Sequence, residues 1–263
     1  MLINVLVGAC LAGVACSLLG VFVVRMKLSS VGFCMSHAAF AGSALGIALS
    51  LNPLILAMVF SCTIAFIIGP MAEKSKLHPD VILGVLFSLT LSLGLIFLKF
   101  TPGTALSSRA MGVLWGSILG IGTKDIIVLG ILTFVILAFM ILFSKELRSI
   151  MFDRKMAEAS GINTRVFYYL ILFLTAGVIS LSLKLIGGLL IFALIINPAA
   201  TAYEFSYDIR KIIIFSPLLG AGCCFLGIGV SFLFDFPIGA SIGIISALCF
   251  GISVILSPKR RKG

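Results

Sequence analysis

Long apolar segments separated by short polar loops constrain the fold of this 263-residue chain more than any other feature. Most of them approach the ~20 residues that a helix needs to cross a ~30 Å hydrocarbon core. Charged residues make up only 11% of the chain, and the apolar runs do not alternate as the strands of a barrel do. The sequence therefore predicts an all-α, polytopic helical membrane protein. We expect nine segments, at about 3–24, 32–50, 53–70, 81–98, 126–143, 166–185, 187–202, 212–233 and 238–256.

The distribution of basic residues predicts the orientation of the chain in the membrane. With nine crossings and the N-terminus outside, 15 of the 19 Lys and Arg residues fall in cytoplasmic loops or in a cytoplasmic C-terminal tail. The seventh segment is short and contains Pro198, so a broken or re-entrant helix there would leave eight crossings. The net charge of +10 is thus mostly explained by basic residues that orient the chain in the membrane, and we expect no nucleic acid as a partner.

One of the two histidines, His37, lies inside the second segment, roughly 13 Å along a helix axis from Leu28. An ionisable side chain at this depth is a candidate functional group, and we expect its ring to be partly solvated. Phe33 and Cys34 share its helix face by their spacing. The alternative is a neutral imidazole that is hydrogen-bonded to a neighbouring helix.

A second face of the same segment carries a small residue at every fourth position, which would let another helix approach closely in lipid. These residues are Ala38, Gly42, Gly46 and Ser50.

The chemistry that the sequence lacks narrows the function. All nine acidic residues fall in loops or near the ends of the predicted helices. Ion-coupled carriers and cation channels usually hold carboxylates within the bundle, so this distribution argues against the alternative of an ATPase-independent secondary carrier or channel. The sequence has no phosphate-binding loop and no protease motif, so we expect neither an ATPase site nor an enzymatic activity of its own.

Two further positions are candidates for function. Asn197 precedes Pro198, and together they would line a polar passage, unless Asn197 only bonds to another helix. In the inner segment 144–165, Asp153 is placed to cap a short helix that stops at Gly161. Such a surface helix between two membrane segments would dock a cytosolic partner or would simply connect them.

Six stretches, in order along nearly the whole chain, resemble the permease subunits of ATP-binding-cassette metal-ion importers of the zinc, manganese and iron type. They are VGFCMSHAAFAG (31–42), DVILGVLFSLTLSLGLIF (80–97), LWGSILGIGTKD (114–125), DRKMAEASGI (153–162), IGGLLIFALIINPAATA (186–202) and DFPIGASIG (235–243).

The resemblance implies a single transmembrane permease domain, 1–263, in a bacterial plasma (inner) membrane. It would form the translocation pathway for zinc, manganese, iron or a metal chelate, with no tightly bound cofactor. The implied partners are a second copy of this chain, a cytosolic subunit that hydrolyses ATP, an extracytoplasmic metal-binding protein and the lipid bilayer. The resemblance also places Ala157, Glu158 and Gly161, behind the cap at Asp153, in the segment that couples to the ATPase.

One position departs from the family. Where the family usually has an aspartate four residues before the histidine, this sequence has Phe33. The usual pair offers oxygen and nitrogen ligands, which suit manganese or zinc. Here His37 is left as a transient pathway ligand, with the Cys34 thiol as a weaker second and with Phe33 and Asn197 as lining. This change fits a softer ion, a metal chelate or passage with little direct ligation. A membrane scaffold without a transport function is the remaining alternative to a permease.

Overall fold

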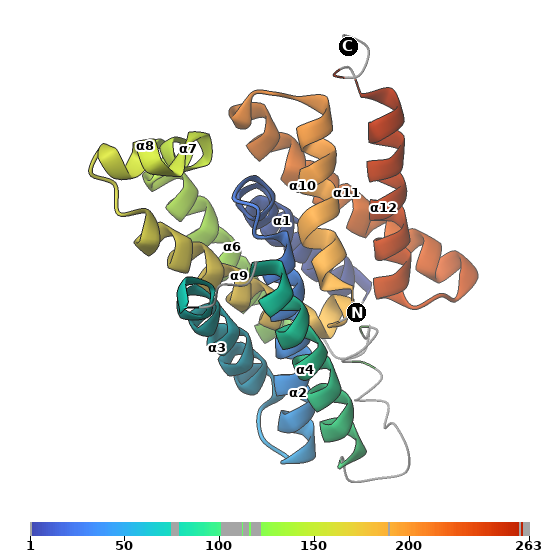
Figure 1. The fold of residues 1–263 in the computed structure, drawn as a ribbon. Coiled ribbons are helices and arrows are strands. Elements are labelled where there is room, and N and C mark those ends of the chain that lie inside the picture. The colour runs from blue at the N-terminus through green and yellow to red at the C-terminus, as the bar shows by residue number, and fades with distance from the viewer. Residues whose placement is uncertain are drawn as a thin grey trace.

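The computed structural model describes residues 2–74, 79–100, 112, 116, 122–188, 190–257 and 259, and these form eleven helices and no strand (Figure 1). The helices are α1 (Leu2–Arg25), α2 (Ser29–Ala48), α3 (Pro53–Lys74), α4 (Pro79–Lys99), α6 (Thr123–Leu142), α7 (Ser144–Phe152), α8 (Arg154–Ala159), α9 (Thr164–Ile186), α10 (Ile191–Phe205), α11 (Ile209–Phe234) and α12 (Ile238–Leu256). The outer stretch 114–125 that carries part of the family resemblance lies mostly outside the described residues.

The all-α membrane fold is confirmed. Seven helices are long and apolar enough to cross a membrane, namely α1, α2, α4, α6, α9, α11 and α12, and α3 and α10 supply two shorter apolar stretches. These nine helices coincide with the nine predicted segments. The number that cross fully and the side on which each terminus lies remain predictions.

The seventh predicted segment, 187–202, is helical only from Ile191, and from there α10 continues without a break through Pro198. Its 15 residues span about 22 Å, less than the ~30 Å of a hydrocarbon core. A full crossing therefore needs non-helical backbone at membrane depth, which is tolerated where protein buries it. The turn before α10 meets this condition at Gly188, where an added Cβ would lie 2.9 Å from the Cβ of Phe40.

Small residues bring helix backbones into contact, as the sequence predicts for α2. A Cβ added at Gly42 would clash with the carbonyl of Leu56, and one added at Gly46 would lie 2.6 Å from the Cα of Pro53, so both glycines pack against α3. Ser50 does not extend this face, because α2 ends at Ala48 and Ser50 lies in the following turn with a φ of +55°.

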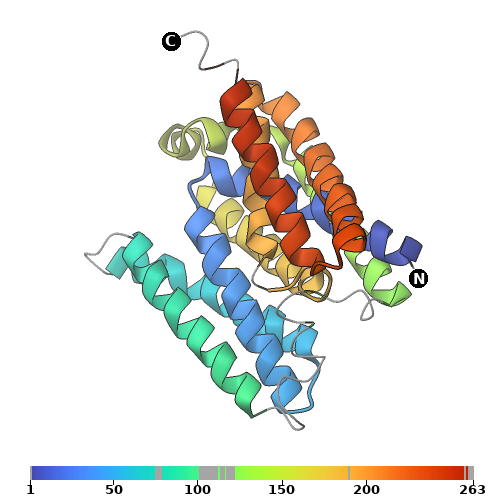
Figure 2. The ribbon, with the colours of Figure 1, turned by 90° about the vertical axis from the view of Figure 1, so that its right-hand side faces the viewer.

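The two ends of the bundle differ in what they carry. In Figure 1, α7, α8, the connection from α10 to α11 and the C-terminus lie at the top, while the connection from α2 to α3 and the end of α4 lie at the bottom. Figure 2 shows α4 on one side of the bundle and α11, with the start of α6, on the other. Basic side chains tie the upper end together: Arg25 Nε donates to the carbonyl of Met151 at 3.0 Å, and Lys259 lies 4.0 Å from the ring centroid of Tyr207.

Candidate functional site

Aromatic rings from α2 and α4 contact His37 in the middle of α2, and a ring from α10 packs against one of them. Its imidazole contacts Phe33 and Phe87 edge to face, with ring centroids 4.7 Å and 4.6 Å away. Phe33 also stacks on Phe87 at 4.7 Å and lies 4.8 Å from Phe192 of α10. We call Phe33, His37, Phe87 and Phe192 the aromatic–histidine cluster. His37 is only 4% exposed, so the expectation of a partly solvated ring is wrong for this conformation of the single chain.

The hydrogen bonds of His37 decide which ring nitrogen stays available. Its Nδ1 lies 3.0 Å from the carbonyl oxygen of Phe33 and 3.4 Å from the hydroxyl of Ser36, which itself donates to the same carbonyl at 2.8 Å. A carbonyl oxygen can only accept, so this bond requires the proton on Nδ1. In the neutral ring Nε2 then keeps its lone pair, and it has no hydrogen-bond partner among the described residues.

The alternative predicted for His37 is a hydrogen bond to a neighbouring helix, whereas the hydrogen bonds that its ring forms with described residues stay within α2. Both polar partners of His37 belong to α2 itself, and the neighbouring helices α4 and α10 contribute aromatic rings. The helix fixes the tautomer and the ring orientation, and the free Nε2 can ligate a metal ion.

Cys34 lies one turn from His37 and is fully buried in the apolar core. In the described part of the chain, no group of three or more His, Cys, Asp or Glu side chains could hold a metal ion. Resident zinc sites have three or four protein ligands. The cluster therefore suits brief contact with a passing ion, and the ligand roles of His37 and Cys34 stay predictions.

Nothing in the sequence singles out Phe87 and Phe192. Both fall within stretches that carry the family resemblance, but apolar helices offer no pattern that marks which phenylalanine faces the histidine. The contact exists only once α2, α4 and α10 have packed together.

Asn197 joins two helices. Its Nδ2 donates to Ser246 Oγ of α12 at 3.0 Å, and Ser246 donates in turn to the carbonyl of Gly243 at 2.9 Å. This is the bond between helices that the sequence left open for Asn197. Its role in lining a pathway remains a prediction.

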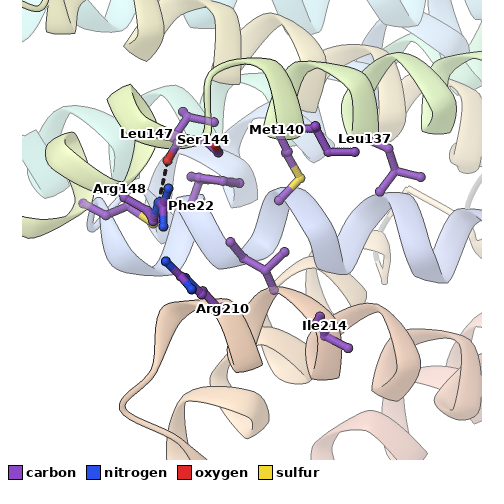
Figure 3. Close-up of a pocket in the computed structure, with 11 residues that line it drawn as sticks. Phe22, Leu137, Met140, Ser144, Leu147, Arg148, Arg210 and Ile214 are labelled. Atoms are coloured by element: carbon purple, nitrogen blue, oxygen red, sulfur yellow. Dashed lines mark hydrogen bonds between the residues drawn. The ribbon is translucent and has the colours of Figure 1, made fainter.

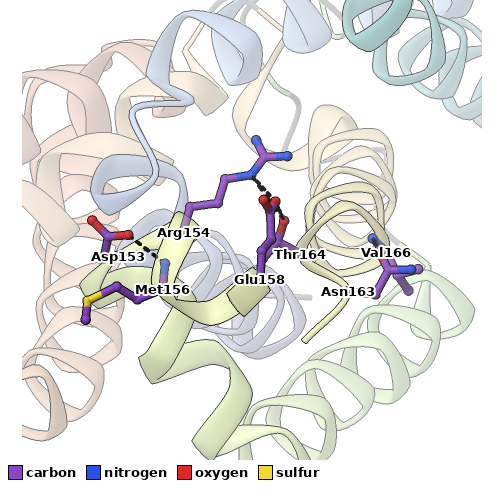
Figure 4. A network of polar contacts seen from close by, with 7 residues as sticks. All are labelled: Asp153, Arg154, Met156, Glu158, Asn163, Thr164 and Val166. Atoms are coloured by element: carbon purple, nitrogen blue, oxygen red, sulfur yellow. Dashed lines mark hydrogen bonds and ion pairs between the residues drawn. The ribbon is translucent and has the colours of Figure 1, made fainter. Parts of the chain in front are cut away.

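The predicted cap at Asp153 is confirmed. Its Oδ1 accepts a hydrogen bond from the backbone N–H of Met156 at 2.9 Å, and α8 follows directly as Arg154–Ala159 (Figure 4). The cap satisfies one of the N–H groups that a helix leaves unpaired at its start, so this short helix begins where the sequence places it.

The predicted stop at Gly161 is also confirmed. Gly161 has a φ of +84°, and its N–H donates to the carbonyl of Glu158 at 3.0 Å. The N–H of Ile162 donates to the carbonyl of Ala157 at 3.1 Å. These two bonds form a Schellman motif, which requires a left-handed residue where glycine is the least strained choice.

Polar contacts fasten α8 to the start of α9. Arg154 Nε lies 3.1 Å from both Glu158 Oε1 and Thr164 Oγ1, and the Thr164 hydroxyl donates to the Glu158 carboxylate (Figure 4). Hydrogen bonds from Thr164 and then from Arg154 hold the pKa of the Glu158 carboxyl below its usual range. The ion pair is about half exposed, so it orients α8 more than it stabilises the fold.

We call α7 and α8 together the α7–α8 platform. Its inner side is packed against the bundle, since Leu147, Ile150 and Ala157 are buried. Its outer side leaves two large apolar side chains open, Phe152 at 76% and Met156 at 62% exposure. Exposed apolar side chains at the rim of a membrane bundle are a feature of protein–protein contacts.

Comparison with known proteins matches residues 1–257 to a family model described as the ABC 3 transport family. The manganese import system permease protein ScaB of Streptococcus gordonii is 33% identical, over 98% of this chain and 92% of that protein. The high-affinity zinc uptake system membrane protein ZnuB of Haemophilus influenzae is 33% identical, over 95% of this chain and 97% of that protein. A solved structure, PsaBC from Streptococcus pneumoniae in complex with Fab, is similar with a TM-score of 0.88 and 31% identity, covering 98% of this chain and 92% of that one.

Proposed function

This chain belongs to the ABC 3 transport family, and from that premise we propose that it carries zinc or manganese past His37, with zinc preferred. It is a multi-span permease subunit of an ATP-binding-cassette metal importer in a bacterial inner membrane, and it is a transport component, not an enzyme. The observation that carries the choice of cargo is the nearly full-length similarity to permeases for both manganese and zinc. The rival of an ATPase-independent carrier is not favoured.

The preference for zinc rests on the ligands. Carboxylate oxygen suits manganese, whereas an imidazole suits zinc well. Here the residue one turn before His37 is Phe33, so no carboxylate joins the imidazole, which offers its free Nε2. A single nitrogen ligand holds an ion weakly enough to release it, and Cys34 could assist only after a rearrangement of the core.

The partners and the orientation follow from the two ends of the bundle. We place the α7–α8 platform in the cytoplasm, where Phe152 and Met156 would contact a separate ATP-hydrolysing subunit. Asp153, Ala157, Glu158 and Gly161 would act in coupling by holding that platform in shape.

The remaining assembly follows from the family. A second copy of the chain would complete the pathway, and an extracytoplasmic metal-binding protein would deliver the ion at the opposite end. Each chain, 1–263, would form one permease domain.

The test is ATP-dependent metal uptake by the purified complex in proteoliposomes, with a panel of zinc, manganese, iron and cobalt. We expect uptake only with ATP and with the highest catalytic efficiency for zinc. Uptake that proceeds equally without ATP would favour the carrier instead. Equal uptake of manganese and zinc would show that the lack of a carboxylate at Phe33 does not make zinc the preferred ion.

A further inference from the structure

A partly open cavity of about 420 Å³ lies between α1, α6, α7 and α11 (Figure 3). Phe22 of α1 lines it, as do Met140 and Ile141 of α6. None of the residues that line it belongs to the aromatic–histidine cluster, which is built from α2, α4 and α10. The cavity is therefore separate from the proposed metal pathway.

One end of the cavity is positively charged. Arg148 comes from α7 and Arg210 from the first turn of α11, and Figure 3 shows both guanidinium groups at the same end of the cavity. Arg148 Nε donates to the carbonyl of Ser144 at 2.8 Å. None of the eleven lining residues is acidic, and neither arginine forms an ion pair with any other described residue.

The other end of the cavity is apolar and follows the membrane helices. Leu137 and Ile214 lie there, away from the two arginines (Figure 3), and Ile141 and Ile214 are largely exposed. From Leu142, the last residue of α6, back to Leu137 is about 8 Å along the helix, at ~1.5 Å per residue. Because α6 ends at Leu142 and α11 begins at Ile209, the charged end lies at the ends of two apolar helices, where we expect the membrane surface.

We propose that this cavity binds an anionic glycerophospholipid. Its phosphate would lie between Arg148 and Arg210, since guanidinium groups match phosphate oxygens in geometry and charge. One acyl chain would run past Met140 and Leu137 toward the membrane interior. The inner leaflet is rich in anionic lipid, which raises the occupancy of basic sites at this depth.

A lipid bound here would connect two parts of the protein that are distant in sequence. Arg148 belongs to the α7–α8 platform, and Arg210 begins α11. The phosphate would therefore link the platform to the C-terminal half of the bundle, and the lipid would stabilise the platform against thermal melting.

The experiment is native mass spectrometry of the full-length protein in detergent, titrated with phosphatidylglycerol or with phosphatidylcholine of the same acyl chains. We expect phosphatidylglycerol to be retained about tenfold more tightly, because its headgroup keeps the net negative charge that the choline of phosphatidylcholine cancels. Replacing both arginines with glutamine, Arg148→Gln and Arg210→Gln, should abolish that preference. Replacing both with lysine should retain most of it.

The matched control changes the same net charge on the same two helices. Lys145→Gln with Lys211→Gln alters two exposed cations that do not line the cavity, and we expect less than about a twofold change. Equal loss in the control pair, or equal retention of phosphatidylcholine, would overturn the proposal. So would competition by glycerol phosphate as effective as the intact lipid, or displacement of the lipid by the ATPase subunit.

Discussion

The aromatic–histidine cluster and the α7–α8 platform use their polar groups in different ways. In the cluster, Nδ1 of His37 is hydrogen-bonded to the backbone of α2, and two aromatic rings contact the imidazole. Nε2 keeps a lone pair that can accept a hydrogen bond or bind a metal ion. In the platform, caps and side-chain bonds satisfy the polar groups, and the apolar Phe152 and Met156 are left open.

The difference shows where to look for function in each region. A buried region is expected to satisfy its polar atoms, and in His37 only Nδ1 pairs with a described residue, which leaves Nε2 able to meet an ion. Many apolar side chains of the bundle are exposed, as expected where lipid covers them, but the platform lies beyond the apolar helices in our proposal, so Phe152 and Met156 there are candidates for a protein contact. In both regions we assign function to a group that has no partner among the described residues of its own region, namely Nε2 of His37 in the cluster and the side chains of Phe152 and Met156 in the platform.

The largest effect should come from the cluster. His37→Ala removes the only nitrogen ligand that we place in the pathway, so uptake of zinc in proteoliposomes should fall to background. Because the ring is buried among Phe33 and Phe87, the substitution also leaves a cavity and should lower the stability by about 2 kcal/mol. Measurable uptake at normal expression would remove His37 from the pathway.

The next effect concerns the platform. Phe152→Asp with Met156→Asp replaces both open apolar side chains, and co-purification of the ATPase subunit should weaken at least about tenfold because their burial at the contact is lost. Phe152→Leu with Met156→Leu keeps apolar area and should keep the complex. Full association of the aspartate pair would mean that this surface does not dock the ATPase.

A smaller change is expected from Phe33→Asp, which supplies the carboxylate that the family usually has. It should shift the uptake ratio severalfold from zinc toward manganese, since a hard oxygen ligand joins the imidazole. Phe33→Asn introduces a neutral side chain of similar size as the control. A selectivity that is the same in both variants would show that the carboxylate charge is not what discriminates the ions.

The smallest effect should come from Gly161→Ala. A Cβ at Gly161 would meet no atom within 4 Å, so only the left-handed backbone opposes it, by about 1 kcal/mol. Amide hydrogen exchange in α8 should accelerate about fivefold. Gly161→Asn, which tolerates this conformation better, should show less acceleration, and unchanged exchange in the alanine variant would mean that the glycine is not needed for the end of α8.

The sequence predicts local features of this protein well. Apolar length locates the seven helices that could cross a membrane and the two shorter apolar ones, and the cap at Asp153 and the stop at Gly161 follow from hydrogen-bond chemistry within a few residues. The small-residue face of α2 predicts a close helix approach, although not that α3 is the partner.

The aromatic–histidine cluster could not be predicted in the same way. Phe87 and Phe192 meet His37 and Phe33 only through the packing of three helices, and phenylalanine is equally stable facing lipid or protein in a membrane. The burial of His37 was missed for the same reason, since an imidazole at membrane depth is compatible with either a wet passage or an aromatic enclosure.

The most direct test of the account is ATP-dependent zinc uptake by the His37→Asn variant of the complex in proteoliposomes, measured together with its melting temperature. The asparagine amide can donate to the carbonyl of Phe33 as Nδ1 of His37 does, but it offers no nitrogen lone pair in place of Nε2. We expect background uptake and a melting temperature that falls less than that of His37→Ala, because the donor to Phe33 is kept while the two ring contacts are lost. Wild-type uptake by this variant would contradict the account, because His37 would then serve only as a hydrogen-bond donor within α2.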